Sequence, residues 1–150
     1  MIRPATLSDK EAVIGLLREF FGQTEYSDLG WSQKSIEDIV ERLITTDSAV
    51  ILVSDGVTGL IGGYLTPYWM NMDKVFAQEM FWYVSKEHRG GSLGIRLLNA
   101  FQEWAKDGGA DYCVMSSTTN LNPSGVGNVL KRSGFVPVDI SYWKRLTNGN

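Results

Sequence analysis

Two stretches in the first third of the chain carry apolar side chains at the spacing of an amphipathic helix. In the first stretch, the apolar positions recur three and four residues apart and share one helix face: Val13, Leu16, Leu17, Phe20 and Phe21. In the second stretch, the same spacing joins Ile36, Ile39, Val40, Leu43 and Ile44. Either Ser32 or Ser35 would serve as the N-cap of this second helix. Residues 2–5 predict a short strand ahead of both helices.

The pattern then changes to that of β-strands. Residues 49–54 form a continuous apolar run, as in a strand that is buried on both faces. Asp55 and Gly56 follow as a hairpin turn signal. Residues 60–65 predict the returning strand and residues 75–84 a further one. These three strands are expected to form an antiparallel meander.

The C-terminal half alternates helices and strands. A helix beginning near Ser92 is predicted to end at Gly108 and Gly109; its apolar face comprises Leu97, Leu98, Phe101, Trp104 and Ala105. Residues 112–115 predict a short buried strand, and Asn122 as N-cap with Pro123 in the first turn indicates another helix. Residues 135–138 and 140–146 predict a closing hairpin. A strand, turn, helix and strand over residues 75–116 imply a parallel pair inside an otherwise antiparallel sheet, so the fold class is α+β.

The amino-acid composition excludes several classes of function. The 150 residues are expected to form a single domain over 1–150, with a net charge of −3 that does not suit binding to nucleic-acid phosphates. One cysteine and one histidine exclude an internal disulfide and the multi-histidine or multi-cysteine metal sites. No apolar run is long enough to span a bilayer. The prediction is a cytoplasmic, metal-independent protein with no nucleic-acid or membrane partner.

A glycine-rich loop joins the strand that ends at Val84 to the helix that begins near Ser92. Its sequence from Arg89 to Gly94 is Arg-Gly-Gly-Ser-Leu-Gly. Glycines allow backbone N–H groups to turn toward a ligand, and a helix N-terminus adds partial positive charge, so the loop suits a phosphate or diphosphate. The alternative is that the glycines only permit a tight turn. Neither a P-loop nor a dinucleotide-binding glycine pattern is present.

The segment from Val84 to Leu98 resembles motif A of the GNAT superfamily of acetyl-CoA-dependent N-acetyltransferases. Arg89 and Gly94 match the first and last places of the Arg/Gln-x-x-Gly-x-Gly/Ala pattern, whereas Ser92 stands where glycine is usual. Residues 122–135 resemble motif B, in which an Asn precedes a helix that ends in Gly-Phe. The resemblance is to the small GNAT proteins of phages and bacteria. It implies a mixed, mostly antiparallel sheet of six or seven strands, flanked by about four helices, with the parallel pair at the cofactor cleft.

The resemblance also implies how the co-substrate acetyl-CoA would be held. Backbone groups of the loop, including those of Arg89, Gly90, Gly91, Ser92 and Gly94, would bind the diphosphate of coenzyme A. Tyr83 and Val84 would line the cleft, with the Val84 amide facing the thioester carbonyl. Asn122 would lie near the pantetheine arm. No metal is implied.

The chemistry that the resemblance implies is direct transfer of an acetyl group to a primary amine with the help of a general base. Glu79 is the candidate base, because it lies in an otherwise apolar strand five residues before Val84. The alternative for Glu79 is an ordinary solvent-facing strand residue. The tyrosine that usually serves as acid is replaced by Leu130, and Tyr142 or Ser124 could take over. Because of Leu130 and Ser92, a catalytically weak acyl-CoA-binding or protein-interaction module is the alternative function.

The acceptor side is predicted from aromatic residues near acidic ones. Tyr26, Trp31 and Trp69 are the candidate acceptor-binding residues, and Glu25 and Asp73 lie close to them in the sequence. Such groups suit the amine of a small molecule or a peptide through cation–π and ionic contacts. The alternative is that these aromatic residues are structural. The C-terminal hairpin would also offer an edge at which a second copy could form a homodimer.

Overall fold

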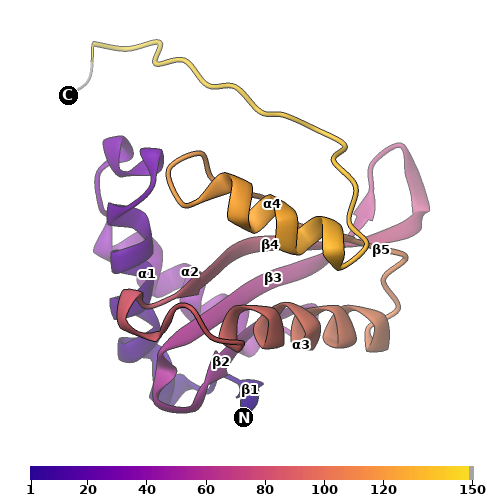
Figure 1. Cartoon of the computed structure of the whole chain (residues 1–150), viewed down its shortest axis with the longest axis horizontal. Coiled ribbons are helices and arrows are strands. Elements are labelled where there is room, and N and C mark those ends of the chain that lie inside the picture. Colours follow the sequence, from indigo (N-terminus) through magenta and orange to yellow (C-terminus); the bar gives the residue numbers. More distant parts are fainter. Residues whose placement is uncertain (149–150) are drawn as a thin grey trace.

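The structure is a computed structural model that describes residues 1–148. Its helices are α1 (Lys10–Gly22), α2 (Gln33–Thr45), α3 (Leu93–Asp107) and α4 (Pro123–Arg132), shown in Figure 1. Its strands are β1 (Ile2–Pro4), β2 (Ala49–Ser54), β3 (Gly59–Tyr68), β4 (Asn71–Val84) and β5 (Tyr112–Val114). Short 3-10 turns join them; η2 (Glu25–Leu29) lies between α1 and α2.

The strands form one sheet in the order β1-β2-β3-β4-β5. Neighbouring strands are antiparallel except β4 and β5, which pair in parallel at Phe76–Tyr112, Ala77–Cys113 and Gln78–Val114. The α+β class, the parallel pair and the four helices are therefore confirmed. The prediction of six or seven strands is wrong, because the described residues contain five.

The missing strands are those of the expected closing hairpin. Residues 135–138 and 140–146 adopt no strand, and Figure 1 shows this segment leaving α4 as an extended chain. Its alternating apolar residues are typical of a strand, but a strand also needs a neighbouring edge with which to pair. No edge in the described part of this single chain pairs with it, so the local pattern alone misled the prediction.

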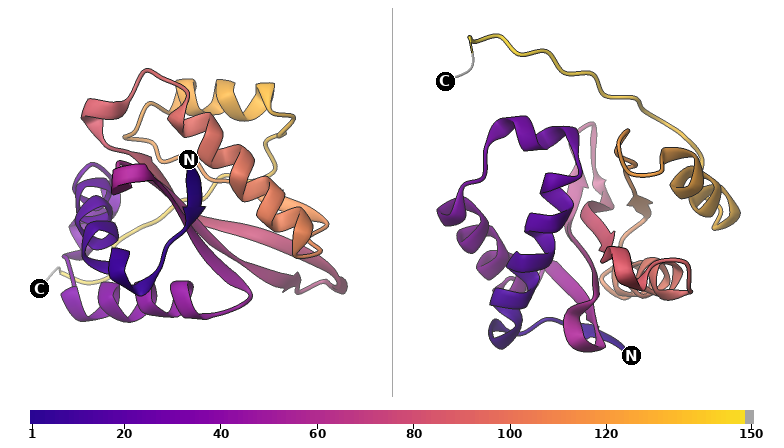
Figure 2. Two further views of the ribbon diagram at one scale, coloured as in Figure 1. Left: turned by 90° about the horizontal axis from the view of Figure 1, so that it is seen from below. Right: turned by 60° about the vertical axis from the view of Figure 1, so that its left-hand side comes forward.

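Two apolar layers enclose the sheet. Helices α1 and α2 cover one face and α3 covers the other, as Figure 2 shows. The first layer contains Val13, Leu17 and Val40 from the helices, packed near Phe81 and Tyr83 from β4. The second layer is built around Leu97 and Phe101 of α3, with Ile61 and Ala77 from the sheet. Burial of these side chains holds the strands that carry the candidate site.

A β-bulge at Met80 changes the face to which β4 side chains point. Gly63 pairs with Glu79 while the adjacent Gly62 pairs with Phe81, so Met80 is the extra residue. In a regular strand, Ala77 and Phe81 would point to the same face, because they are four residues apart. Here Ala77 packs in the α3 layer, whereas Phe81 packs in the layer of α1 and α2. The Phe81 ring lies directly over Gly62, where an added Cβ would come within 2.3 Å of it. The bulge thus lies next to Glu79. Bulges commonly occur beside functional sites, where they change the direction of a side chain.

Asn122 starts α4 as predicted. Its side chain accepts a hydrogen bond from the Gly125 N–H at 3.3 Å, and its backbone is left-handed, with φ of 43°. Asn122→Ala removes the side-chain cap and places an alanine in a left-handed conformation that asparagine tolerates better. We expect this change to destabilise α4 by about 1–2 kcal/mol.

Asn122→Gly is the matched control, because glycine loses the side-chain cap but adopts positive φ freely. Hydrogen exchange of the amides of residues 126–132 measures the effect. Protection should fall much further in the alanine variant than in the glycine variant, and equal losses would contradict a role for the backbone conformation.

Candidate active site

The candidate site lies where β4 and β5 separate. Their pairing ends at Gln78 and Val114, and the described residues after β5 form no further strand pair with β4. Glu79 stands directly after the last pair, and its Oε2 accepts a hydrogen bond from the backbone N–H of Ser116 at 3.1 Å. The sheet is therefore open on one side of β4 from Glu79 to Val84, with a carboxyl group at the inner end of the opening.

Glu79 is a buried carboxyl group with no basic partner. Its residue is 7% exposed, and the Ser116 N–H donates the one hydrogen bond to its carboxylate within the described residues. Burial raises the pKa of Glu79 to about 8, and the Ser116 hydrogen bond lowers it by a smaller amount. Burial, together with the nearby Glu79 charge, also raises the pKa of the Cys113 thiol to about 11. Glu79 can therefore hold or release a proton near neutral pH.

The same burial predicts a measurable effect on stability. A carboxyl pKa that is higher in the folded than in the unfolded state means that the folded state retains a proton that the unfolded state loses. The contribution of Glu79 to the free energy of unfolding is therefore fully present below the ordinary carboxyl pKa of 4.5, and it is lost as the pH rises toward about 8. Glu79→Gln cannot ionise, so we expect its free energy of unfolding to exceed that of the wild type increasingly above pH 5.

Urea denaturation at several pH values measures this difference. Glu103→Gln is the control, because Glu103 is exposed on α3 and the change should show no such trend. A difference between Glu79→Gln and the wild type that is independent of pH would contradict a buried, protonated Glu79.

The backbone of Val84 faces the open side of β4. Val84 is opposite Gly59 on β3, and the Ser85 N–H donates to the Thr58 carbonyl at 2.9 Å. This pattern identifies Gly59 and Val84 as a non-hydrogen-bonded antiparallel pair, in which the N–H and C=O of both residues point away from the partner strand. The Val84 N–H is therefore directed to the edge that β5 leaves free, in the same opening as Glu79.

The loop of residues 89–94 presents unpaired backbone N–H groups at the start of α3. Within the described residues, none of these N–H groups donates a hydrogen bond. Gly90 has φ of 89°, a conformation that favours glycine, and the indole of Trp82 anchors the helix start by donating to the Gly94 carbonyl at 3.1 Å. Free N–H groups at a helix N-terminus form a site for an anion.

A hollow of about 330 Å³ opens beside this helix start. Gly91 and Ser92 line it together with His88 and Arg96, two groups that can carry positive charge. Asp55 also lines the hollow, but its carboxylate is paired with the N-terminal ammonium at 2.7 Å. The surroundings of the loop therefore do not oppose the binding of a phosphate.

Arg89 fixes the loop instead of pointing into it. Its Nε donates to the Val84 carbonyl at 2.9 Å, its guanidinium donates to Gln23 at 3.1 Å, and it lies over the Tyr83 ring at 5.0 Å. The Tyr83 side chain is buried on the face covered by α1, where its hydroxyl accepts a hydrogen bond from Gln23. The structure thus places Val84 and the loop backbone at the opening, but directs the Tyr83 side chain away from it.

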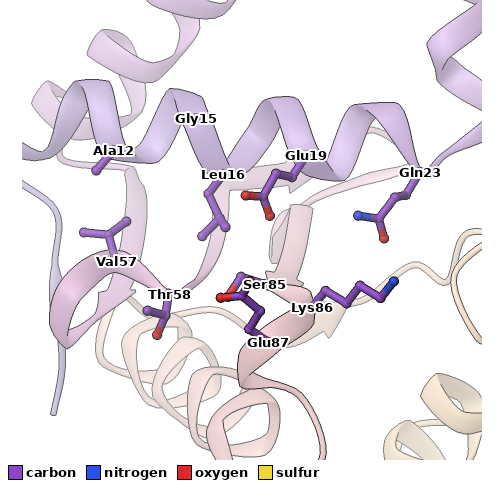
Figure 3. Close-up of a pocket in the computed structure, with 10 residues that line it drawn as sticks. All are labelled: Ala12, Gly15, Leu16, Glu19, Gln23, Val57, Thr58, Ser85, Lys86 and Glu87. Atoms are coloured by element: carbon purple, nitrogen blue, oxygen red, sulfur yellow. The ribbon is translucent and has the colours of Figure 1, made fainter.

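A larger groove of about 600 Å³ lies on the α1 side of the same region, and the sequence did not indicate it. Figure 3 shows Glu19 and Gln23 of α1 facing Ser85 and Lys86 across the groove. Glu79 does not line it. The groove and the opening between β4 and β5 are therefore separate features, and the buried carboxyl group belongs to the opening.

The family model described as "Acetyltransferase (GNAT) family" matches residues 11–135. This chain belongs to the GNAT family. GNAT acetyltransferases take their acyl group from acetyl-CoA, and the match includes β4, the loop and α3. Among curated proteins, none matches this GNAT chain.

Solved structures share the GNAT fold over nearly the whole chain. A putative acetyltransferase from Agrobacterium tumefaciens str. C58 has a TM-score of 0.75 at 14% identity, covering 97% of this chain and 99% of that one. A ribosomal-protein-alanine N-acetyltransferase from Brucella melitensis has a TM-score of 0.72 at 19% identity, covering 98% and 99%. The aminoglycoside N-acetyltransferase AAC(6')-Iy in complex with CoA has a TM-score of 0.74 at 16% identity, covering 97% and 93%.

The family's usual acid position is apolar in this GNAT chain. Leu130 lies on α4, and its side chain carries no proton to donate. Tyr142, the predicted substitute, lies on the C-terminal segment with 90% of its surface exposed. No hydrogen bond joins Tyr142 to the described residues of the opening. The structure therefore does not bring Tyr142 to Glu79 and Val84.

The three predicted acceptor residues do not gather in one place. Tyr26 on η2 is half exposed and contacts the Trp143 ring at 5.2 Å. Trp31 packs edge-on against Phe21 between α1 and α2, as a structural residue would. Trp69 lies at the β3–β4 turn and is 76% exposed. Figure 1 shows this turn at the opposite end of the molecule from the α1–α2 connection.

Within residues 1–148, no helix is long and apolar enough to cross a membrane. In the same range, no three acidic, histidine or cysteine side chains form a group that could hold a metal ion.

Proposed function

We propose that the protein transfers an acetyl group from acetyl-CoA to a primary amine, with Glu79 as the general base. The observation that carries this proposal is the buried Glu79 carboxyl, with a pKa of about 8, at the inner end of the opening that Val84 lines. Membership of the GNAT family indicates acetyl-CoA as the donor. Two of the structurally similar proteins, an aminoglycoside N-acetyltransferase and a ribosomal-protein-alanine N-acetyltransferase, transfer the acetyl group to nitrogen.

The opening fits the donor at both ends. At the outer end, the free N–H groups of residues 89–94 suit the diphosphate of coenzyme A. At the inner end, the Val84 N–H points toward the space where the thioester would lie. A hydrogen bond from this N–H to the thioester oxygen would stabilise the charge that develops during attack, and one such donor contributes about 3 kcal/mol. Asn122, which caps α4, would contact the pantetheine arm.

Glu79 makes the amine reactive. An alkyl ammonium has a pKa of about 10.4, so near neutral pH only a small fraction is the free amine that attacks a thioester. Ionised Glu79 would take the proton, directly or through a water molecule. The amine nitrogen then bonds to the acetyl carbon, the carbon–sulfur bond breaks, and the second proton of the attacking nitrogen passes to the departing thiolate or to water. Because a thiol pKa is about 8.5, the thiolate can leave without an acid, consistent with Leu130 at the usual acid position.

The acceptor is proposed to be the amine of a small molecule or of a peptide. Tyr26 supports this side of the proposal, because its half-exposed ring lies in η2 beside Glu25 and Asp28. An aromatic face and nearby carboxylates attract a cationic amine before it is deprotonated. Trp31 and Trp69 have no comparable surroundings, and for them a binding role rests on the sequence alone.

A thiol-release assay tests the proposal. Acetyl-CoA is supplied with a panel of aminoglycosides, polyamines, amino acids and short peptides, and free coenzyme A is measured in the presence and absence of protein. We expect release with at least one amine, together with an acetylated product seen by mass spectrometry. Measurable binding of CoA with no release on any amine would favour the catalytically weak binding module instead.

A further inference from the structure

Gln23 lies at the C-terminal end of α1, next to the end of β4. It caps the helix, because its backbone N–H donates to the carbonyls of Phe20 and Phe21 in the last turn. Its half-buried side chain points from α1 into the groove shown in Figure 3. The chemistry described above uses Val84 and Glu79 but gives Gln23 no part.

The side-chain amide of Gln23 makes two hydrogen bonds with different partners. Its Oε1 accepts from the Arg89 guanidinium at 3.1 Å, and its Nε2 donates to the Tyr83 hydroxyl at 2.6 Å. Arginine can only donate, so the amide oxygen must face Arg89 and the amide nitrogen then faces Tyr83. Tyr83 is itself buried, with its ring 5.6 Å from that of Phe20. These contacts give the Gln23 amide a single orientation.

Gln23 helps to hold Arg89 in place. The Arg89 guanidinium lies over the Tyr83 ring at 5.0 Å, and its Nε donates to the Val84 carbonyl at 2.9 Å. Arg89 is exposed, and among the described residues no carboxylate forms an ion pair with it. A long exposed side chain has many rotamers and is fixed only by its contacts. The Gln23 amide oxygen is the side-chain acceptor that fixes this guanidinium within the described structure.

The carbonyl that Arg89 binds belongs to the peptide unit between Val84 and Ser85. At the other end of this unit, the Ser85 N–H donates to the Thr58 carbonyl at 2.9 Å. A peptide unit is planar, so hydrogen bonds at both ends fix its orientation. The Val84 N–H is joined to this unit through the Val84 Cα and points to the same open side as the Val84 carbonyl. Arg89 therefore helps to set the direction of the Val84 N–H.

The Val84 carbonyl also matters for the electrostatics of the opening. Its oxygen and the Val84 N–H point to the same side, so an unpaired carbonyl would repel negative charge that develops on the thioester oxygen. The Arg89 Nε–H occupies the carbonyl oxygen and places positive charge beside it. Donors that are already in position stabilise a transition state without reorganising during the reaction. Displacement of Arg89 would therefore affect the transition state more than the bound donor.

We propose that Gln23 is a positioning residue for acetyl transfer: by fixing Arg89 against the Val84 carbonyl, it keeps the Val84 N–H directed at the thioester oxygen. The inference rests on the proposed function, because it concerns the same N–H donor. Gln23 acts only through Arg89 and touches neither substrate in this role. The position needs a side chain that presents an acceptor to Arg89, which glutamate also does and an apolar residue does not.

Steady-state kinetics and calorimetry test this role with three variants. Gln23→Leu removes both hydrogen bonds, and we expect kcat to fall by about tenfold or more, part of the 10²–10³-fold that loss of a whole oxyanion donor costs. The affinity for CoA should change little, because the loop N–H groups remain. Gln23→Glu should restore most of kcat, since its carboxylate accepts from Arg89. Glu19→Leu is the control, because Glu19 is an exposed residue one turn earlier in the same groove.

Three kinetic results would overturn the inference. The first is a Gln23→Leu variant with the kcat of the wild type. The second is an equal loss of kcat in Gln23→Leu and Gln23→Glu, which would mean that an acceptor for Arg89 is not what the position supplies. The third is a loss of affinity for CoA as large as the loss of kcat, as expected if Gln23 only maintained the structure of the loop.

Amide NMR provides a readout that needs no acceptor amine. In the wild type, the Val84 amide should shift differently with acetyl-CoA than with CoA. In Gln23→Leu, this difference should shrink while the loop amides of residues 90–94 still shift, and in Gln23→Glu it should persist. An unchanged Val84 difference in Gln23→Leu contradicts the role of Gln23 alone. No Val84 difference in the wild type contradicts the proposed donor geometry and this inference together.

Discussion

Glu79→Gln lowers kcat by about 10²–10⁴-fold if Glu79 is the base, while leaving the affinity for acetyl-CoA unchanged. Glutamine is nearly the same size and can still accept the Ser116 hydrogen bond, but it cannot take a proton. The loop of residues 89–94 that would hold the donor is not altered. The measurement is steady-state kinetics with the amine found by thiol release, together with calorimetry for acetyl-CoA.

The pH dependence makes this first prediction specific. With a pKa of about 8, the ionised base form of Glu79 increases with pH, so the wild-type kcat should rise to a plateau above pH 8. In Glu79→Gln, the rate should continue to rise toward the amine pKa, because only amine that is already neutral can react. Glu103→Gln should behave as the wild type does. Full activity of Glu79→Gln with an unchanged pH profile would refute the role of Glu79.

Ser92→Glu weakens binding of coenzyme A by at least about tenfold relative to Ser92→Gln, a loss of roughly 1.4 kcal/mol. The two side chains are alike in size, and Ser92 is exposed at the start of α3, so neither change disturbs packing. A carboxylate at a helix N-terminus stabilises the helix, so weaker binding of CoA by Ser92→Glu would not be caused by a loss of folding. The carboxylate would occupy the N–H groups intended for the diphosphate and would also repel it.

Calorimetry with CoA measures this second effect at two salt concentrations. The difference between the Glu and Gln variants should shrink as salt rises, because charge repulsion at an exposed site is screened. Dephospho-CoA, which retains the diphosphate, should show the same difference. Equal affinity of Ser92→Glu and Ser92→Gln for CoA would place the diphosphate elsewhere.

Local periodicity was sufficient to predict the first two-thirds of the fold. Residues of α1, α2 and α3 repeat at helical spacing; Ser32, one of the two serines that the sequence offered, caps α2, and Asn122 caps α4 as predicted. The extent of β4 could not be predicted in the same way. Asn71, Asp73 and Lys74 are polar, and this segment is drawn into the strand by pairing across the hairpin, where Tyr68 lies opposite Asn71. Such pairing depends on the preceding strand across the turn, and the pattern of residues 71–74 alone does not contain it.

The candidate site was predicted in part. Glu79 was identifiable because a carboxyl group in an apolar strand is costly unless it has a use or a partner. The faces to which the β4 side chains point could not be predicted, because the bulge at Met80 interrupts the regular alternation of side chains along the strand. Tyr83 was grouped with Val84 at the cleft, although neighbouring side chains of a strand point to opposite faces and the structure directs the Tyr83 side chain to α1. The predicted strands at residues 135–138 and 140–146 are wrong for a related reason, because a strand needs a neighbouring edge and no edge in the described part of the chain pairs with them.

In the proposed complex, acetyl-CoA lies between the loop of residues 89–94 and Glu79, and an amide NMR titration tests this placement directly. The protein is titrated with CoA and, separately, with acetyl-CoA. We expect both to shift the amides of the loop, and the difference between the two ligands to be largest at Val84, which would face the thioester carbonyl. Unmoved loop amides, with the main shifts instead at Gly15 and Thr58 in the groove beside α1, would contradict the account.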